Sequence, residues 1–434
     1  MSERALDIFI NDRKIGTLRE ENDLWKFDYE QAWSDASDGF NLSPALDRRT
    51  ISHVDGASDR PVQWYFDNLL PEEGLRTVLS KEANIPEADA FGLLEYFGAE
   101  SAGSLILRSP GYPAVAKKGL RELPDDVLYQ RILDLPGLSL SRDSPKHMSL
   151  AGAQHKLPVI YRDKKLYEPE AGEVSTHILK PDHPDTDYPG SVINEYVVMR
   201  LAKAVGLNAP DVHRHYCPAP VYIVERFDRV HGNSPVQRVH VIDTCQLLNK
   251  SRSFKYSEAT VGTLAEVLRY IRIKTRARLW LFQWLVFNAL AGNGDNHLKN
   301  ISFMVSADGV GISPGYDLLS TAVYATKAIA LERATWPHTS LALRFPDAQN
   351  FSEVTRLTLQ NAGKALGLSE DTATRELDRM LENIIPAADQ IIATIQAENS
   401  LLPDAVRPYL AGEMRVLQTI RHLILAEMVQ KLKR

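Results

Sequence analysis

The residues best suited to chemistry lie in residues 292–300, which read GNGDNHLKN, and at Asp317. Asp295 and Asn300 have the D-x-x-x-x-N spacing at which a carboxylate can accept a hydroxyl proton while an amide oxygen holds Mg²⁺. Asp317 follows seventeen residues after Asn300 and is placed to bind a metal that bridges phosphates. The chemistry that this set predicts is metal-dependent phosphoryl transfer.

The elements around these residues are expected to bring them together. Residues 301–305 alternate like a strand, residues 306–309 form a tight turn, and residues 310–313 return. The very apolar residues 279–290 predict a buried helix that anchors the loop from behind, which is how rigid elements commonly position functional loops. The alternative is an ordinary loop, because Asp, Asn and Gly cluster in loops without any chemistry.

A lysine and a glutamate further forward have the order of a phosphate-binding pair. Residues 176–180 predict a strand that ends in Lys180, and residues 191–205 predict a helix that carries Glu195 and stops at Gly206. In kinases such a lysine binds the nucleotide phosphates and the glutamate holds the lysine. The alternative is a surface lysine and a solvated glutamate.

Two further segments suit a nucleotide. Residues 148–157 place small residues and Gly152 between two strands, where backbone N–H groups can face phosphates, although a plain hairpin loop fits equally. Residues 220–224 predict a strand that ends at Glu225, where backbone groups could pair with adenine and Phe227 could cover the ring. The alternative is a core strand with Phe227 packed inside.

The rest of the chain predicts a β-rich beginning and a helical end. Residues 109–145 hold five prolines and are expected to be a connecting region. The other expected elements are a hairpin over residues 5–18, a strand over 24–29, helices from Pro61 with a break at Pro71, a helix over 86–97, a strand over 103–107, an amphipathic helix over 261–273, and helices over 352–434.

Composition narrows the class of protein. The chain has 434 residues and a net charge of −6, which argues against broad autonomous nucleic-acid binding. Cys217 and Cys245 lack metal-binding spacing, so a zinc site is not expected. The amino terminus is too polar for a signal peptide, and the longest apolar run, about a dozen residues, is too short for a membrane span. We expect a cytoplasmic protein with no membrane segment.

Taken together, the motifs resemble the HipA family, serine/threonine kinase toxins of bacterial HipBA-type toxin–antitoxin modules. The order and spacing agree over roughly residues 145–330, and the β-rich beginning and total length agree too. The matching pieces are residues 149–156 (SLAGAQHK), 177–181 (HILKP), Asn194-Glu195, 224–229 (VERFDR), Cys245-Gln246, 292–300, and 316–320 (YDLLS).

The resemblance implies a role for each matching residue. Asp295 would be the catalytic base, Asn300 and Asp317 the Mg²⁺ ligands, and Glu195 the partner of the phosphate-binding Lys180. The other residues implied to line the ATP site are Ala151, Gly152, Ala153, Glu225, Phe227, Gln246, His297 and Tyr316. Ser149 would be an autophosphorylation site whose phosphate displaces the phosphate loop and stops ATP binding; a hydroxyl that caps its own turn is the alternative.

The resemblance also implies a fold and partners. The fold would be α+β and two-lobed, like a protein kinase, with a β-rich domain over residues 1–115, a connecting region over 116–145, a small lobe over 146–225 and a largely helical large lobe over 226–434. Partners would be a homodimeric, HipB-like helix-turn-helix antitoxin and operator DNA reached mainly through it. A further partner would be a protein substrate such as an aminoacyl-tRNA synthetase, glutamyl-tRNA synthetase in the best-known relative.

Two other functions fit parts of the pattern. A small-molecule kinase of the aminoglycoside-phosphotransferase type would share the Asp/Asn/Asp set, but a self-phosphorylating Ser149 loop would be unexpected in it. A catalytically inactive corepressor would only bridge DNA-bound partners, and the presence of Lys180, Asp295, Asn300 and Asp317 argues against it.

Overall fold

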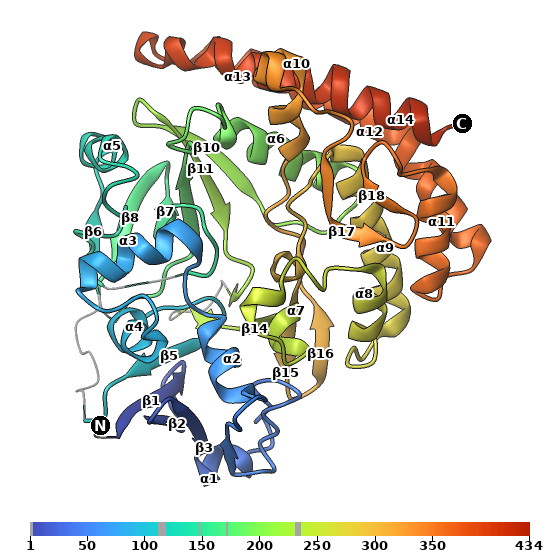
Figure 1. Cartoon of the computed structure of the whole chain (residues 1–434). Coiled ribbons are helices and arrows are strands. Elements are labelled where there is room, and N and C mark those ends of the chain that lie inside the picture. The colour runs from blue at the N-terminus through green and yellow to red at the C-terminus, as the bar shows by residue number, and fades with distance from the viewer. Residues whose placement is uncertain (1–2, 112–118, 147, 149, 171, 231–235) are drawn as a thin grey trace. The chain divides into compact units, whose positions relative to one another are not determined.

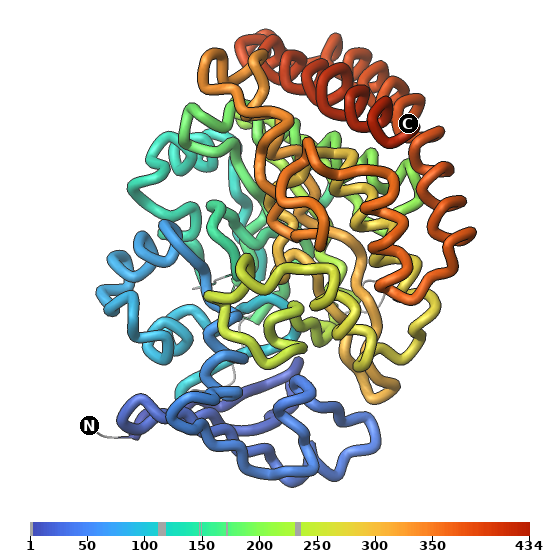
Figure 2. Tube along the Cα trace, turned by 45° about the vertical axis from the view of Figure 1, so that its right-hand side comes forward, coloured from blue at the N-terminus to red at the C-terminus, as the bar shows by residue number. Residues whose placement is uncertain are grey.

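The computed structural model describes residues 3–111, 119–146, 148, 150–170, 172–230 and 236–434 (Figures 1 and 2). The chain divides into two compact units, and each is assembled from segments that are separated in sequence. The first unit comprises residues 1–179, 225–254 and 302–313; the second comprises residues 180–224, 255–301 and 314–434. The four domain boundaries expected from sequence stay a prediction.

The first unit begins with a five-stranded antiparallel sheet. Its strands in spatial order are β4 (Ser52–Val54), β3 (Leu24–Tyr29), β2 (Arg13–Glu21), β1 (Arg4–Ile10) and β5 (Leu105–Arg108). The predicted hairpin is confirmed, with Leu6, Ile8 and Ile10 buried on one face. Alternation of apolar and polar residues therefore fixes which face of this sheet forms the core.

Four helices accompany that sheet: α1 (Gln31–Ser34), α2 (Pro61–Asp67), α3 (Glu73–Ala83) and α4 (Ala90–Phe97). The break expected at Pro71 separates α2 from α3. The helix expected over residues 86–97 begins only at Ala90, so that prediction was too long. The Asp89 carboxylate accepts a hydrogen bond from the Gly92 N–H at 3.0 Å and caps the helix there.

A second sheet in the first unit is antiparallel and follows the order β9, β7, β8, β6. Its strands are β6 (Leu120–Glu122), β7 (Leu157–Arg162), β8 (Lys165–Pro169) and β9 (His177–Pro181), the last of which carries the chain into the second unit. The expected connecting region is thus not irregular throughout, because it supplies β6 and helix α5 (Asp125–Leu133).

The later segments of the first unit form small sheets. They are the pair β12 (Arg229–Val230) and β13 (Gln237–Arg238), then β14 (His240–Asp243), the short helix α7 (Thr244–Leu247), and the hairpin β15 (Ser302–Ser306) and β16 (Gly309–Ile312). The hairpin expected after the Asp/Asn loop is confirmed, with Ser306 opposite Gly309 at its turn.

The second unit is mostly helical. Its strands form two hairpins, β10 (Val212–Tyr216) with β11 (Pro220–Glu225), and β17 (Ser340–Phe345) with β18 (Ala348–Asn350). Its helices are α6 (Ser191–Ala204), α8 (Val261–Val267), α9 (Lys274–Ala291), α10 (Lys327–Ala330), α11 (Arg356–Ala365), α12 (Glu370–Asn399), α13 (Arg407–Thr419), a π-helical segment (Ile420–Leu425) and α14 (Ala426–Leu432). The helix expected over residues 261–273 was predicted too long, since α8 ends at Val267.

Helix α9 forms the centre of this unit. The side chains of Trp284, Leu285, Val286 and Phe287 are all buried, so the helix is covered on every side. It packs against α11, α12 and α14, while α6 packs against α12 and α13, the long helices coloured orange to red in Figures 1 and 2. Among the helices in the described ranges, none has the length and apolar content that crossing a bilayer requires.

Candidate active site

Lys180 lies between two carboxylates in the second unit. Its Nζ donates to both oxygens of Glu195, at 2.7 and 3.0 Å, and to Oδ1 of Asp317. Lys180 and Glu195 are both buried. Burial opposes the charge on Lys180, but Asp317 and Glu195 outweigh it and raise the pKa of the ammonium above its usual value. The lysine is therefore held as a cation at this point.

Helix α6 positions both partners of that lysine. Glu195 projects from the helix, and the neighbouring Asn194 binds the segment just after Asp317. The Asn194 Nδ2 donates to the Ser320 carbonyl at 2.9 Å, and its Oδ1 accepts from the Ser320 N–H at 2.8 Å. Asp317 has a φ of 57°, in the left-handed region that residues other than glycine rarely adopt. Such strain persists where surrounding contacts impose it, often at functional sites.

The end of α9 builds the Asp/Asn loop. Gly292 terminates the helix with a φ of 66°, and a Cβ there would lie 2.7 Å from the Cβ of Ala322. The next residue, Asn293, donates from Nδ2 to Oδ1 of Asn288 at 2.7 Å, inside the buried helix. Its Oδ1 accepts from the Asp295 N–H at 3.0 Å. The loop is thus tied to the rigid helix behind it, as expected.

The backbone carbonyl of Asp295 closes the loop. It accepts from the His297 N–H at 2.9 Å and from Nδ2 of Asn300 at 2.7 Å. Asp295 and Asn300, which were paired by spacing alone, are therefore in direct contact. The contact uses the amide nitrogen of Asn300 and leaves its carbonyl oxygen to accept or coordinate.

The Asp295 carboxylate has a tyrosine on one oxygen. The hydroxyl of Tyr256 donates to Oδ1 at 2.7 Å, and Nε2 of His297 lies 4.0 Å from the same oxygen. Partial burial raises the pKa of Asp295 above its usual value, although His297 and Tyr256 act in the opposite direction. No local pattern in the sequence pointed to Tyr256, because it lies 39 positions before Asp295.

The two segments that carry the predicted metal ligands are also in contact. The Tyr316 hydroxyl donates to the carbonyl of Lys299 at 2.6 Å, which joins the residue before Asp317 to the residue before Asn300. Tyr316, expected to line the ATP site, here holds the loop ends together. Its contact with a nucleotide stays a prediction.

The donor set suits Mg²⁺. Asn300 offers an amide oxygen, and the Asp317 side chain, 31% exposed, offers a carboxylate. In the described parts of the chain, no group of three or more His, Cys, Asp or Glu side chains could form a metal cage. A kinase site needs none, because Mg²⁺ is commonly held by one or two carboxylates together with substrate phosphates and water. The arrangement can therefore bind a metal with its phosphates and accept a proton at Asp295.

The predicted phosphate loop lies in the first unit. Ala151, Gly152 and Ala153 follow in sequence, and Lys156 folds back so that its Nζ donates to the Ala151 carbonyl at 2.7 Å. Gly152 has a φ of 109°, and a Cβ there would lie 2.7 Å from that Nζ. Glycine is thus required by the loop itself. Ser149 lies outside the described residues.

Three further residues predicted to hold the nucleotide belong to the first unit: Glu225, Phe227 and Gln246. Glu225 ends β11, and Phe227, half-buried, follows it. Gln246 is buried, and its side chain caps α7 by accepting from the Asp243 N–H at 3.0 Å while donating to the Tyr65 carbonyl at 2.9 Å. These contacts give Gln246 a structural role. Nucleotide contacts of all three residues stay a prediction.

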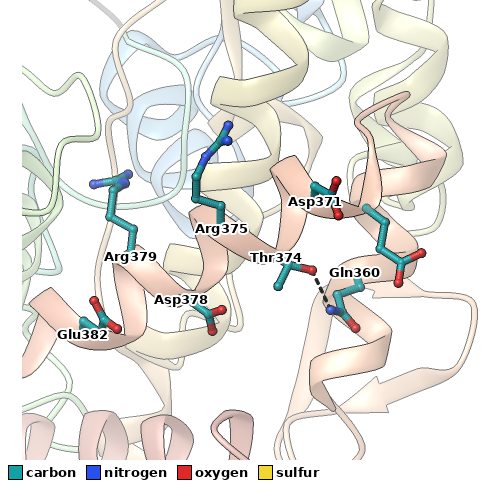
Figure 3. Close-up of a pocket in the computed structure, with 8 residues that line it drawn as sticks. Gln360, Asp371, Thr374, Arg375, Asp378, Arg379 and Glu382 are labelled. Carbon is teal, nitrogen blue, oxygen red and sulfur yellow. Dashed lines mark hydrogen bonds between the residues drawn. The ribbon is translucent and has the colours of Figure 1, made fainter.

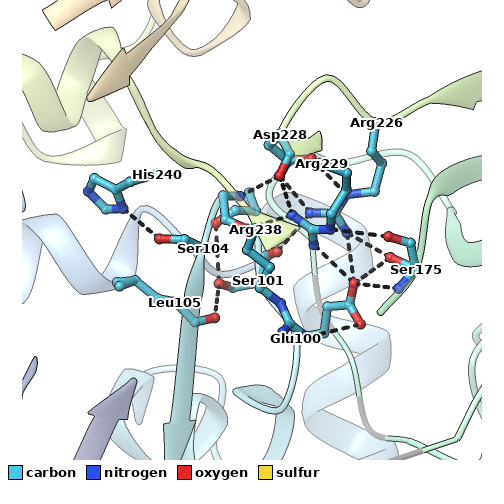
Figure 4. Close-up of polar contacts among 12 residues, drawn as sticks. Glu100, Ser101, Ser104, Leu105, Ser175, Arg226, Asp228, Arg229, Arg238 and His240 are labelled. Carbon is cyan, nitrogen blue, oxygen red and sulfur yellow. Dashed lines mark hydrogen bonds and ion pairs between the residues drawn. The ribbon is translucent and has the colours of Figure 1, made fainter. Parts of the chain in front are cut away.

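A buried ionic network that the motifs did not predict flanks these segments (Figure 4). Glu100 accepts from Lys146 at 2.7 Å and from Arg226 and Arg229 at 3.1 Å each. Burial alone would raise the pKa of Glu100, but these cations hold it well below its usual range. Lys146 precedes the predicted phosphate loop and Arg226 follows Glu225, so one carboxylate fixes both segments within the first unit.

An open pocket in the second unit lies apart in sequence from these residues (Figure 3). It is lined by Gln360, Glu370, Asp371, Thr374, Arg375, Asp378, Arg379 and Glu382, on α11 and α12. Gln360 donates to the Thr374 hydroxyl at 2.8 Å across it. None of the predicted site residues lines this pocket, and its mixed charged side chains offer no convergent chemistry.

Comparisons with known proteins agree with this picture. Two family descriptions match the chain: the HipA N-terminal domain over residues 6–108 and the HipA-like C-terminal domain over residues 148–388. A putative kinase, Y4mE of Sinorhizobium fredii, is 32% identical over 399 residues, which cover 88% of this chain and 93% of that protein. The serine/threonine-protein kinase toxin HipA of Shewanella oneidensis is 32% identical over 342 residues, covering 74% of this chain and 76% of that protein.

A solved structure extends the match to the fold. The complex of HipA, HipB and operator DNA from Shewanella oneidensis contains a chain that aligns with a TM-score of 0.76 and 27% identity, covering 98% of this chain and 99% of that chain. The predicted α+β, kinase-like architecture with its β-rich beginning is confirmed. The chain belongs to the HipA family of toxin kinases.

Proposed function

We propose that this chain is an ATP- and Mg²⁺-dependent protein serine/threonine kinase and the toxin of a toxin–antitoxin module. The observation that carries the proposal is the arrangement around Lys180, which is shared between the Glu195 and Asp317 carboxylates. The second unit that holds it also holds the Asp295 loop. Kinase homologues support the same reaction class.

The residues around Lys180 and Asp295 have different roles in the transfer. Asp295 accepts the proton of the acceptor hydroxyl as that oxygen forms its bond to phosphorus. Asn300 and Asp317 hold Mg²⁺, which when bound neutralises charge on the phosphates. Lys180 leaves Asp317 for the phosphates and keeps Glu195 as its partner. Catalysis by these residues is positioning and charge stabilisation rather than covalent chemistry.

The sequence resemblance to the family supports further contacts of the nucleotide with residues 151–153, Glu225, Phe227 and His297. The backbone of residues 151–153 covers the phosphates, the chain at Glu225 pairs with adenine, and Phe227 covers the ring. Support for the loop is the positive φ of Gly152, where the lack of a side chain leaves the backbone open to close approach. Gln246 lines the nucleotide site, and its side chain also caps α7.

The kinase phosphorylates itself on Ser149, and this silences it. A phosphate adds about −1.5 to −2 charge at neutral pH, which opposes the phosphates of ATP beside the same loop. The support for this step is the motif in residues 149–156, which matches the family in sequence.

The proposed partners are supported by the relative of known structure, which was solved in complex with HipB and operator DNA. A HipB-like helix-turn-helix antitoxin, as a homodimer, binds this chain and carries it to operator DNA, where the complex represses its own operon. The net charge of −6 suits indirect rather than autonomous DNA binding. In the bacterial cytoplasm the free kinase phosphorylates a translation factor, an aminoacyl-tRNA synthetase being the first candidate, and growth stops.

Growth arrest in cells tests this function. Expression of the wild-type chain should stop growth, and Asp295→Asn should abolish the arrest while still forming a complex with the antitoxin, because only the proton acceptor is lost. Toxicity of Asp295→Asn equal to that of the wild type would contradict the role of Asp295. Repression by both proteins without toxicity of either would favour a corepressor, and phosphorylation of an aminoglycoside but of no protein would favour a small-molecule kinase.

A further inference from the structure

Tyr256 makes the side-chain contact on the carboxylate that acts as base. Its hydroxyl donates to Oδ1 of Asp295 at 2.7 Å. Asp295 is 42% exposed at its side chain, and within the described residues Oδ2 receives no hydrogen bond. One oxygen of the carboxylate is thus fixed by the protein, and the side chain as a whole is partly exposed.

The segment that carries Tyr256 is hydrogen-bonded to the loop that holds Asp295. The backbone carbonyl of Lys255 accepts from the Leu298 N–H at 3.1 Å, which joins the segment before Tyr256 to residues 292–300. The ring of Tyr256 meets the ring of His297 edge to face, with centroids 4.8 Å apart and planes at 85°. These contacts hold the hydroxyl near Asp295 although 43% of Tyr256 is exposed.

The backbone of Asp295 is already fixed without the tyrosine. Asn293 accepts from its N–H at 3.0 Å, and Asn300 donates to its carbonyl at 2.7 Å. What these two contacts leave undetermined is the rotation of the side chain. A partly exposed aspartate can turn its carboxylate through several staggered and terminal orientations, and only some of these aim an oxygen at an acceptor.

We propose that Tyr256 is a positioning residue for phosphoryl transfer: its hydrogen bond to Oδ1 of Asp295 fixes the carboxylate so that Oδ2 meets the acceptor hydroxyl. This inference rests on the proposed kinase function. As the acceptor oxygen bonds to the γ-phosphorus, the bond between that phosphorus and the β–γ bridging oxygen breaks. ADP leaves, and the acceptor proton passes to Oδ2 while Tyr256 keeps its own.

The proposal requires that losing the hydroxyl impair turnover and spare nucleotide binding. The lysine and the metal ligands do not depend on the orientation of Asp295. Losing a hydrogen bond to a charged group costs enough free energy to lower a rate roughly tenfold or more. A residue that merely supports the fold would instead lower ATP affinity, stability and turnover together.

The experiment compares the full-length wild type with Tyr256→Phe, which removes one oxygen atom. Transfer from [γ-³²P]ATP with Mg²⁺ is measured to dephosphorylated casein and to the chain itself, and ATP binding is measured by calorimetry. We expect kcat to fall roughly tenfold, with the KM for ATP and its Kd changing less than about twofold. Tyr270→Phe is the matched control, since that tyrosine is 39% exposed and its hydroxyl has no hydrogen-bond partner in the described chain; it should behave as wild type.

Three results for Tyr256→Phe would overturn the proposal while leaving the kinase function standing. An unchanged kcat would show that Asp295 is oriented without the hydroxyl. A higher kcat or a lower KM for casein would show that Tyr256 blocks the acceptor position instead of preparing it. Parallel losses of kcat, ATP affinity and thermal midpoint would show a structural role. Failure of the wild type itself to bind ATP and to transfer phosphate would refute the kinase function, and this inference with it.

Discussion

At the scale of single residues, Lys180 joins the two halves of the proposed phosphate site. One buried ammonium contacts the carboxylates of Glu195 and Asp317. Two carboxylates so close to one cation would repel each other without it. The lysine therefore has a structural task before any nucleotide arrives and a chemical task afterwards.

Replacing this lysine should impair both stability and nucleotide binding. Lys180→Met keeps much of the side-chain length but leaves Glu195 buried without its cation, which we expect to cost about 3 kcal/mol of unfolding free energy. ATP affinity should fall as well, because the phosphates lose a charge-assisted contact. Urea denaturation and ATP calorimetry measure the two effects.

The control for this variant is Lys203→Met. Lys203 pairs with Asp211 on an exposed part of the second unit, with 53% of its side chain accessible. Exposed pairs contribute little, so stability should change by less than about 1 kcal/mol. Equal losses in both variants would contradict the role assigned to Lys180.

The residues of this site differed in how far sequence could predict them. Spacing paired Asp295 with Asn300 and Lys180 with Glu195, and each pair is in contact. Tyr256 could not be found in this way, because its approach to Asp295 depends on how a distant loop returns to the end of α9. Patterns reveal contacts within an element or a short loop, and long-range contacts need the fold.

At the scale of elements, α6 organises the site through its first turns. Glu195 holds Lys180, and Asn194 holds the segment after Asp317. The helix is capped from outside by Asp182, whose Oδ1 accepts from the Val192 N–H at 2.7 Å and from the Ser191 hydroxyl at 3.3 Å. A carboxylate is favourable at a helix N-terminus, but this one is partly buried.

Burial makes the cap sensitive to pH. It raises the pKa of Asp182 from 3.8 to about 6, against the two hydrogen bonds. The pKa of Asp182 in the folded protein lies above its pKa in the unfolded chain, so the folded protein binds this proton more tightly. The resulting contribution to the unfolding free energy is present below about pH 4 and is lost as the pH rises through about 6. At about 1.4 kcal/mol per pKa unit, the loss is about 3 kcal/mol.

Asp182→Asn should remove that dependence, because asparagine keeps an oxygen for the Val192 N–H and has no proton to release. The unfolding free energy of the wild type should fall relative to the variant as the pH rises from about 4 to 7. If the unfolding free energies of the wild type and of Asp182→Asn changed in parallel with pH, the prediction would be contradicted. Asp187→Asn is the control: Arg333 lowers the pKa of Asp187, so its titration lies below that window and the wild-type slope should persist.

The observed ends of α4 and α8 show why sequence patterns overestimate the length of a helix. The apolar pattern continued beyond Val267, but α8 stops there, a turn follows over residues 268–270, and the buried Ile271 packs from the residue after that turn. In the same way Pro86 suggested a helix start that the Asp89 cap places four residues later. An apolar residue can reach the core from either conformation, so periodicity alone does not fix an end.

At the scale of the whole molecule, the β-rich beginning is connected to later segments of the first unit by Glu100. That residue follows α4 and is fully buried, and its four basic neighbours are Lys146, Arg226, Arg229 and Arg238. Asp228 supplies a second anion through its pair with Arg226 at 2.7 Å. Charge is thus balanced across segments that are distant in sequence, which no motif could have predicted.

Glu100→Gln should be strongly destabilising. The amide cannot neutralise the surrounding cations, and breaking a buried ionic contact costs about 3–5 kcal/mol. The midpoint of guanidinium denaturation measures the loss. Glu122→Gln is the control, because Glu122 pairs with Lys165 at an exposed position, 55% accessible, and should cost less than about 1 kcal/mol. A Glu100→Gln protein as stable as the control would show that the network contributes specificity rather than stability.

The central claim is that this molecule transfers phosphate from ATP to protein hydroxyls with Asp295 as base. The most direct test is the intact mass of the purified chain before and after incubation with ATP and Mg²⁺, with phosphopeptide mapping, beside Asp295→Asn. We predict a gain of one phosphate on Ser149 in the wild type and none in the variant, with ATP bound by both. No phosphate on the wild type, on itself or on an added protein, would contradict the account.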